Sequence, residues 1–167
     1  GVDIRVMREF DSVQMDEFVQ LFYVEQVRRV RALTKPIIAA VHGFAREGAC
    51  TMAFSCDMVV ASEDATFGYP GVPNLAAPPG MHVWHLQRLL GRMKAAWLIL
   101  SGEPMTAIEA DRGGLLTAVV PTGSLMESVT AMALKLSALS PRALRDTRAL
   151  MYRMECMDFD EVPEAAA

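Results

Sequence analysis

Two short, continuous runs of apolar residues place the strongest constraint on how this chain can fold. Residues 37–41 and 58–62 are almost wholly apolar, without the alternation expected of a strand with one face in water. Such runs are typical of strands buried on both faces of a parallel or mixed sheet. Between them, residues 48–56 are mostly small and apolar, which predicts a short buried helix that begins at Gly48. This alternation favours an α/β fold.

Most of the remaining chain has helical patterns. Helices are expected at residues 12–33, 83–100 with a break at Gly91, from Thr106 onward, 125–139 and 141–157. Further strands are expected at residues 66–69 and 116–120, and irregular structure at the Pro- and Gly-rich residues 70–80.

Composition and charge exclude several classes of protein. With 52% hydrophobic residues the chain is too apolar for disorder, and a net charge of −4 gives no electrostatic reason to bind nucleic acid. No uncharged apolar run reaches the roughly 18 residues of a membrane span, and the start of the chain does not have the pattern of a signal peptide. The cysteines form no metal spacing with the histidines, which predicts thiols in a reducing cytoplasm.

The segment that enters the short helix at Gly48 is the clearest candidate for chemistry. Small residues at Gly48 and Ala49 allow another group to approach the backbone closely. Unpaired N–H groups at the helix start would face that group, which indicates an anion or oxyanion site. Tight helix–strand packing is the alternative explanation. A nucleotide-binding loop is excluded, because neither Gly-x-Gly-x-x-Gly nor Gly-Lys-Ser/Thr occurs here.

Several sequence blocks, in a fixed order, resemble the crotonase (enoyl-CoA hydratase/isomerase) superfamily. The blocks are Lys35-Pro-Ile-Ile-Ala-Ala-Val-His-Gly-Phe-Ala, Gly48-Ala-Cys, Cys56-Asp-Met-Val-Val-Ala-Ser, Ala65-Thr-Phe-Gly, Leu100-Ser-Gly and Val119-Val-Pro. The resemblance implies an α/β fold with a crotonase-type ββα spiral core over residues 1–122. A C-terminal helical oligomerisation region would follow over residues 123–167. Because the sequence begins at the family's first oxyanion segment, we expect it to lack the family's opening strands.

The resemblance also implies chemistry on acyl thioesters of coenzyme A or of an acyl carrier protein. In this family two backbone N–H groups hold the thioester oxygen and stabilise the enolate that forms beside it. By position these groups belong to Val2 and Gly48, and Asp3, Ile4 and Arg5 would join them in binding substrate. Coenzyme A would be part of the substrate, with no separate cofactor or metal, and the assembly would be a homotrimer or hexamer.

The sequence departs from the family's hydratases at two positions. The hydratases carry one glutamate three residues after the oxyanion glycine, where this chain has Thr51. They carry a second at the end of Phe-Gly-x-Pro-Glu, where this chain has Gly71. Hydration needs a base for water and an acid for the α-carbon, and both usual carboxylates are replaced. Isomerase, decarboxylase or hydrolase chemistry is therefore possible. A non-catalytic CoA-binding or structural paralogue is the competing hypothesis.

Three other residues are candidates for acid/base work. Glu47, next to Gly48, either faces the pocket or is a solvated loop acid. Tyr69, beside the second replaced glutamate, either donates a proton or packs in the core. His82, on a helix that borders the acyl pocket in the family, is either an acid/base group or a structural residue. The arginines at 28, 29 and 31 either meet CoA phosphates or form a solvated helix end.

Overall fold

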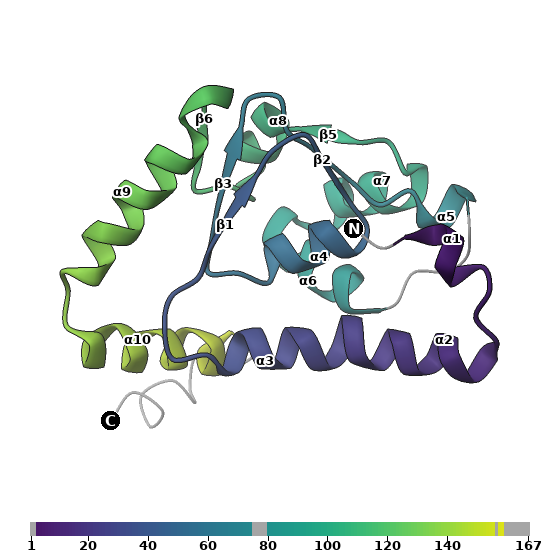
Figure 1. The fold of residues 1–167 in the computed structure, drawn as a ribbon, viewed down its shortest axis with the longest axis horizontal. Coiled ribbons are helices and arrows are strands. Elements are labelled where there is room, and N and C mark those ends of the chain that lie inside the picture. The colour runs from purple at the N-terminus through teal and green to yellow at the C-terminus, as the bar shows by residue number, and fades with distance from the viewer. Residues whose placement is uncertain (1–2, 75–79, 156, 159–167) are drawn as a thin grey trace.

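The computed structural model describes residues 3–74, 80–155 and 157–158 (Figure 1). In chain order the elements are α1 (Ile4–Met7), α2 (Ser12–Val19), the π-helical η1 (Gln20–Glu25), α3 (Gln26–Ala32), β1 (Ile38–Val41), β2 (Phe44–Arg46), α4 (Gly48–Phe54), β3 (Met58–Ser62), β4 (Thr66–Gly68), α5 (Gly71–Asn74), α6 (Gly80–Leu90), α7 (Arg92–Ser101), β5 (Met105–Thr106), α8 (Ala107–Arg112), β6 (Ala118–Val120), the 3-10 turn η2 (Thr122–Ser124), α9 (Leu125–Ser137) and α10 (Pro141–Met154).

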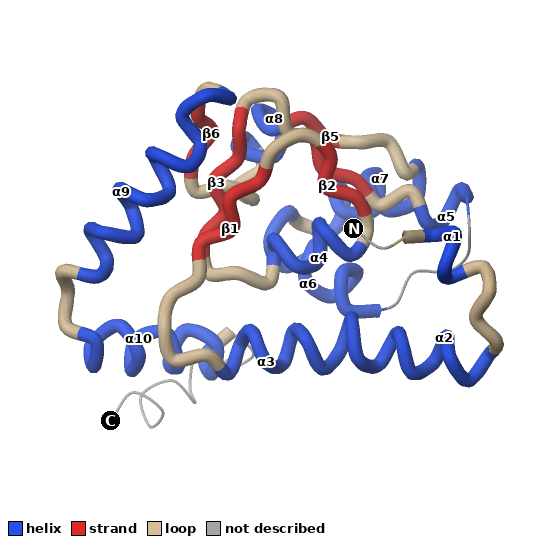
Figure 2. The backbone as a smooth tube through the Cα atoms, in the orientation of Figure 1, coloured by secondary structure: helices blue, strands red, loops and turns tan. Residues whose placement is uncertain are grey.

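The described strands form two small sheets. β1, β3 and β6 are parallel in the order β1-β3-β6, while β4 pairs in parallel with β2 and antiparallel with β5. In Figure 2 the strands lie between α9 on one side and α4, α6 and α7 on the other, and α9 and α4 both contact β1 and β3. The fold is therefore mixed α/β, as the apolar runs indicated, with a helical C-terminal part.

Several local predictions are confirmed. The strand at 58–62 has the expected bounds, the helix expected at 48–56 begins at Gly48 and ends two residues early at Phe54, and Thr106 forms the predicted capping box with Glu109. The long helix at 12–33 is present as α2, η1 and α3 in continuous succession along the bottom of Figure 1.

Two expectations about the strands and loops are wrong, and two strands are absent from the predictions. β2 and β5 have no sequence signal, because strands of two or three residues are too short to show a period. The turn of helix α5 lies within the segment expected to be irregular, with Pro73 in its first turn, where proline costs no hydrogen bond. β1 is only partly buried and Ala40 is exposed, since β1 pairs with β3 along one edge.

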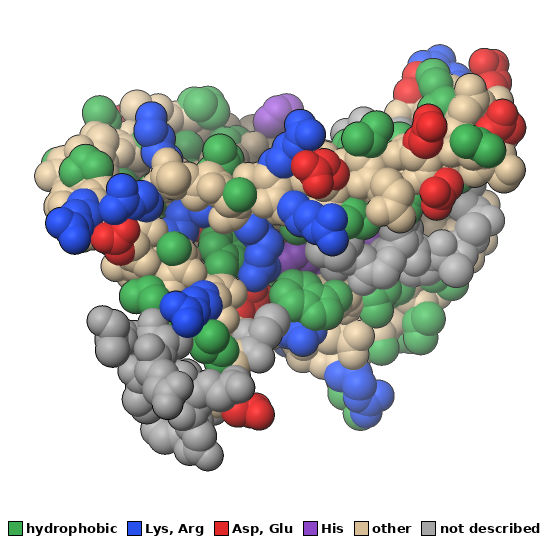
Figure 3. Space-filling model, turned by 90° about the horizontal axis from the view of Figure 1, so that it is seen from below, with side chains coloured by type: hydrophobic (Ala, Val, Ile, Leu, Met, Phe, Trp, Pro, Cys, Tyr) green, Lys and Arg blue, Asp and Glu red, His purple; other side chains and the backbone are tan. Residues whose placement is uncertain are grey.

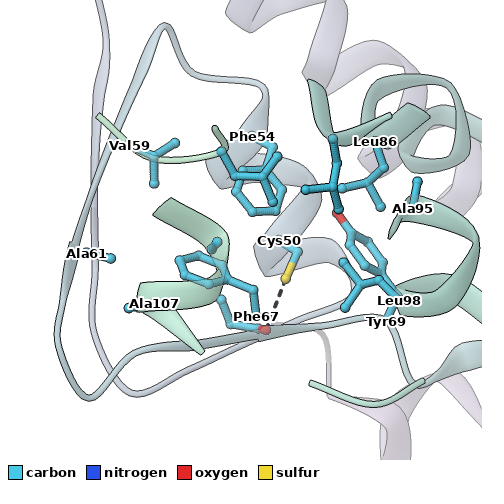
Figure 4. Close-up of a cluster of buried hydrophobic side chains, with 14 of the residues drawn as sticks. Cys50, Phe54, Val59, Ala61, Phe67, Tyr69, Leu86, Ala95, Leu98 and Ala107 are labelled. Carbon is cyan, nitrogen blue, oxygen red and sulfur yellow. Dashed lines mark hydrogen bonds between the residues drawn. The ribbon is translucent and has the colours of Figure 1, made fainter. Parts of the chain in front are cut away.

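Two clusters of apolar side chains form the core. The larger one joins α4, β3, β4, α6 and α7 through residues that include Cys50, Phe54, Phe67, Leu86 and Leu98 (Figure 4). The smaller one packs Leu125 and Val129 of α9 against Val60 of β3. The first turns of α9 are thus part of the core, while Leu134 near its far end and Leu139 just after it remain exposed.

Charge is unevenly distributed along the long helix. Seen from below, acidic side chains gather at the α2 end and basic ones over α3 and α10 (Figure 3). Arg29 pairs with Glu25 at 2.9 Å and Arg31 with Glu155 at 2.6 Å. Arg29 is exposed, as a solvated helix end would be, whereas Arg31 is partly buried and lies over the rings of Trp84 and Tyr152. Among the described residues no helix has the length and apolarity that crossing a membrane requires.

Candidate functional site

The site is built around the start of α4, where Gly48 follows β2. The N–H of Glu47 donates to the carbonyl of Gly68 at 2.9 Å, which continues the parallel pairing of β2 with β4 by one residue. Gly48 is buried, and in the described part of the chain no acceptor is found for its N–H. An unpaired N–H in the first turn of a helix can receive a developing oxyanion.

Glu47 holds this turn in an unusual backbone conformation. Its φ of 47° and ψ of −113° correspond to the first central position of a type II′ turn, which is dominated by glycine. Within the described ranges it is the only non-glycine residue with positive φ. Such a conformation costs about 1–3 kcal/mol and persists where surrounding structure enforces it, often at functional sites.

A narrow pocket runs along the face of α4 that carries Gly48. It is lined by residues of η1, α3 and α4, namely Phe22, Gln26, Val27, Val30, Gly48, Thr51, Met52 and Ser55. The cavity volume is about 10 Å³, room for about one water molecule. Phe22 closes it over Gly48, since a Cβ on this glycine would lie 2.3 Å from Phe22 Cε1. Glycine is therefore needed here for close approach.

The carboxylate of Glu47 turns toward Gly71. The N–H of Gly71 donates to Glu47 Oε1, and a Cβ on Gly71 would lie only 2.8 Å from that oxygen. Burial raises the pKa of Glu47, and the hydrogen bond from Gly71 acts in the opposite direction. The half-buried carboxylate thus occupies space that a side chain at residue 71 would need.

Two buried tyrosines lie within the influence of the Glu47 charge, and a threonine contacts the Glu47 backbone. Tyr69 is 2% exposed, and burial raises its pKa well above the usual value, opposed by a hydrogen bond to Thr51. Tyr23, from η1, is 5% exposed, and burial, followed by the charge of Glu47, raises its pKa to about 12. Both hydroxyls stay protonated at neutral pH. Thr51 Oγ1 also donates to the carbonyl of Glu47 at 3.3 Å.

His82 stacks on Tyr69 with ring centroids 4.5 Å apart and lies 6.4 Å from Tyr23. Its side chain is wholly buried, and neither ring nitrogen has a hydrogen-bond partner among the described residues. Burial lowers the pKa of His82 to about 4, so the ring is neutral at physiological pH. The neutral, enclosed imidazole packs as an aromatic ring against Tyr69.

The structure therefore brings three predicted residues together: Glu47, Tyr69 and His82. It adds Tyr23, which sequence reasoning missed because the helix at 12–33 has no single apolar face to mark an inward residue. The π turn that carries Tyr23 and Phe22 has no recognisable sequence signal, although such turns are frequent at functional sites.

The predicted substrate-binding segment at the start of the chain is only partly described. Val2, the expected first oxyanion donor, lies outside the described residues, and the side chain of Ile4 is not described. Asp3 and Arg5 are exposed and pair with each other at 2.8 Å. The roles of these four residues stay predictions.

The described cysteines are thiols, and Cys50 has a structural environment. Its sulfur lies 3.0 Å from the Ala45 carbonyl and accepts from the Gly68 N–H at 3.3 Å (Figure 4). Burial raises the pKa of Cys50 to about 12, which keeps the thiol protonated. Across the described ranges, His, Cys, Asp and Glu side chains form no group of three that could hold a metal ion.

Comparison with known proteins agrees with this geometry. The model of the enoyl-CoA hydratase/isomerase family matches residues 1–161. A "Probable enoyl-CoA hydratase" from Rhizobium meliloti is 40% identical over 159 residues, covering 93% of this chain and 60% of that protein. The "Probable enoyl-CoA hydratase, mitochondrial" of Dictyostelium discoideum is 36% identical over 140 residues, covering 84% and 50%.

A solved structure gives the same result for the fold. The enoyl-CoA hydratase from Bacillus anthracis superimposes with a TM-score of 0.94 at 26% identity, covering 99% of this chain and 64% of that one. The chain thus spans between one half and two thirds of the length of these proteins. With a family match over almost all of its length and a shared fold, this chain belongs to the enoyl-CoA hydratase/isomerase (crotonase) family.

Proposed function

We propose that this protein acts on an acyl thioester of coenzyme A or of an acyl carrier protein and stabilises the thioester enolate. The Gly48 N–H would hold the thioester oxygen, with the Val2 N–H as second donor. The observation that carries the proposal is the buried, unpaired N–H at the start of α4, beside the pocket lined by Gly48 and Thr51. In a dry site one such donor stabilises a transition state by about 2.7–4 kcal/mol.

The side chains around Gly48 favour enolate chemistry with a single carboxylate. Thr51 and Gly71 occupy the two positions at which family hydratases carry glutamates, and neither can exchange a proton as a carboxylate does. Isomerisation, decarboxylation and thioester hydrolysis remain, because each needs an enolate or oxyanion but not two carboxylates. The relatives named above are called enoyl-CoA hydratases, which supports a CoA thioester as substrate.

Coenzyme A enters this proposal as part of the substrate, with no separate cofactor, and the protein would work in the cytoplasm as a homotrimer or hexamer. Exposed Leu134 on the outer half of α9 and exposed Leu139 just after this helix offer apolar surface for such an assembly. Light scattering of the purified protein measures the oligomeric state directly.

The function is tested with three substrates: crotonyl-CoA, a 3-enoyl-CoA and a malonyl-type CoA, with products followed by mass spectrometry. We expect turnover of at least one. Gly48→Pro deletes the proposed donor and should lower that turnover by about a hundredfold or more. Gly48→Ala is the matched control, because it adds a Cβ against Phe22 as proline does but keeps the N–H.

Two outcomes would contradict the proposal. If Gly48→Pro kept the activity of Gly48→Ala, the N–H would not be an oxyanion donor. If none of the three substrates turned over while CoA still bound, the non-catalytic alternative would replace the enzymatic one.

A further inference from the structure

The contact between Glu47 and Gly71 joins two residues that are 24 positions apart in the sequence. The Gly71 N–H holds Oε1 of the carboxylate, and no other hydrogen bond to this carboxylate is found among the described residues. The second oxygen, Oε2, is therefore free to accept a proton. A carboxylate held at one oxygen has a fixed orientation and an unused lone pair, as a general base requires.

Glycine at residue 71 leaves room for this arrangement. A Cβ there would approach Oε1 to 2.8 Å, so a larger side chain at 71 would require the end of the Glu47 side chain to move from its present position. In the family resemblance, residue 71 is where hydratases carry a glutamate. The chain has lost a carboxylate at 71 and gained one from residue 47 in the space beside it.

The backbone of Glu47 supports the same conclusion. A glycine would adopt φ of 47° without strain, yet the residue is a glutamate whose peptide bond leads directly to the Gly48 N–H. The proposed oxyanion donor and the carboxylate thus belong to consecutive residues. An unfavourable conformation at a position with a reactive side chain favours a functional role over a structural one.

The surroundings of the carboxylate suit proton transfer. The described ion pairs do not include Glu47, since the neighbouring Arg46 bonds instead to Thr66. The titratable groups whose charges couple to it are Tyr23 of η1, Cys50 of α4 and Tyr69. All three remain neutral at physiological pH, so none of them adds a charge beside the Glu47 carboxylate.

We propose that Glu47 is the acid/base residue of this site, moving a proton to and from the α-carbon of the thioester held by the Gly48 N–H. This inference rests on the proposed function. In the forward step the α C–H bond breaks, its proton goes to Glu47 Oε2, and the electron pair passes into the enolate. In the return step the carboxylic acid gives the proton back to carbon and the carbonyl re-forms. The step needs no oxidant, reductant or further reactant.

Hydrogen exchange in heavy water tests this step without assuming the net reaction. The purified protein is incubated with a 3-enoyl-CoA in D2O, and deuterium entering the acyl chain is followed by NMR and mass spectrometry. We expect the unmodified protein to introduce deuterium at C2. Glu47→Gln keeps the size of the side chain and an oxygen for the Gly71 N–H but removes the base, and it should lower the exchange rate at least a hundredfold.

The controls separate this proposal from the proposed function. Glu63→Gln makes the same charge change at an exposed turn between β3 and β4 and should leave exchange unchanged. CoA binding by Glu47→Gln, measured by calorimetry, should stay within threefold of the unmodified protein. The double variant Glu47→Gly with Gly71→Glu supplies the carboxylate from residue 71 in place of residue 47. It should recover part of the exchange that Glu47→Gly alone loses.

Each contrary result has a distinct meaning. Exchange that survives Glu47→Gln but disappears in Gly48→Pro would overturn the role of Glu47 and leave the oxyanion site standing. No exchange and no turnover in the unmodified protein would overturn the proposed function, and this inference with it.

Discussion

Two acidic side chains, Asp57 and Glu47, are both withdrawn from solvent but have very different surroundings. Asp57 accepts hydrogen bonds from the Ile37 N–H at 2.7 Å, from Arg148 at 2.9 Å and from the Tyr152 hydroxyl at 2.8 Å. Glu47 accepts one, from the Gly71 N–H. Asp57 joins the start of β1, the start of β3 and α10, whereas the Glu47 carboxylate faces Gly71, and its charge acts on Tyr23 and Tyr69.

The contrast distinguishes a structural carboxylate from one that is available for chemistry. A carboxylate that accepts three hydrogen bonds, one of them from a buried arginine, is fixed in place and leaves no lone pair in a useful direction. A half-buried carboxylate with one donor is easier to protonate, and burial accordingly raises the pKa of Glu47. A raised pKa makes such a group a stronger base than an ordinary carboxylate.

The largest effect is expected where the Asp57 cluster is broken. Arg148 is 4% exposed and donates to Asp57, to the Val30 and Arg31 carbonyls at 2.8 and 2.9 Å, and to the Leu33 carbonyl. Arg148→Ala leaves a carboxylate and several carbonyls without their donor. We expect a loss of about 3–5 kcal/mol in the free energy of unfolding, measured by urea denaturation.

Arg145→Ala is the matched control for this variant, because Arg145 lies on the same helix and is exposed. Arg145→Ala should lower the free energy of unfolding by no more than about 0.5 kcal/mol. If Arg148→Ala were equally mild, the Asp57 cluster would not hold α10 to the end of α3.

His82 extends the comparison to a buried titratable group that has no hydrogen-bond partner among the described residues. Its pKa is about 4 in the folded protein against a usual value of 6.5, so the unfolded chain binds the proton first as pH falls. The free energy of unfolding therefore falls as pH drops from about 6.5 to 4, and His82 accounts for about 2 kcal/mol of this fall between pH 7 and pH 5. His82→Leu should remove this contribution, which urea denaturation at the two pH values measures.

The exposed His42, replaced in the same way, provides the control for this pH dependence. An unchanged pH dependence in His82→Leu would show that His82 gains a hydrogen-bond partner in solution. At neutral pH His82→Leu should not destabilise the protein, because the two ring nitrogens are already without partners.

The smallest expected effect has the opposite sign. Glu47→Gly releases the strain of φ 47° and removes a carboxylate whose charged form is disfavoured by burial. We expect a gain of about 1 kcal/mol in stability, seen as a melting temperature about 2–4 °C higher. A lower melting temperature would mean that the Glu47–Gly71 contact is mainly structural, like that of Asp57.

Local sequence was sufficient for the elements that carry their own signals. The apolar run at 58–62 determined β3, and Thr106 with Glu109 formed the expected capping box. Gly48 began the predicted helix. β2 and β5 had no signal, because a strand of two or three residues is defined by the strand it pairs with.

In the candidate site, too, some residues could be predicted from local sequence and others could not. Sequence identified Gly48 and named Glu47, Tyr69 and His82 separately, but it left the environment of each open. Tyr23 could not be found, because an inward residue on a helix without a clean apolar face has no distinguishing pattern. Arg148 was missed for a related reason: an arginine in a helix is usually solvated, and its burial depends on partners from α3 and Asp57.

The sequence by itself determined the family blocks, the strand–helix core and the presence of Thr51 and Gly71 where the family resemblance predicts two hydratase glutamates. Only the tertiary structure decided that Glu47 fills the space beside Gly71. The parallel pairing of β2 with β4 sets Arg46 opposite Gly68, so the two strands leave the sheet side by side. Glu47, one residue beyond β2, can then reach Gly71, three residues beyond β4. Register between distant segments is a property of the packed sheet, and no local pattern of residues contains it.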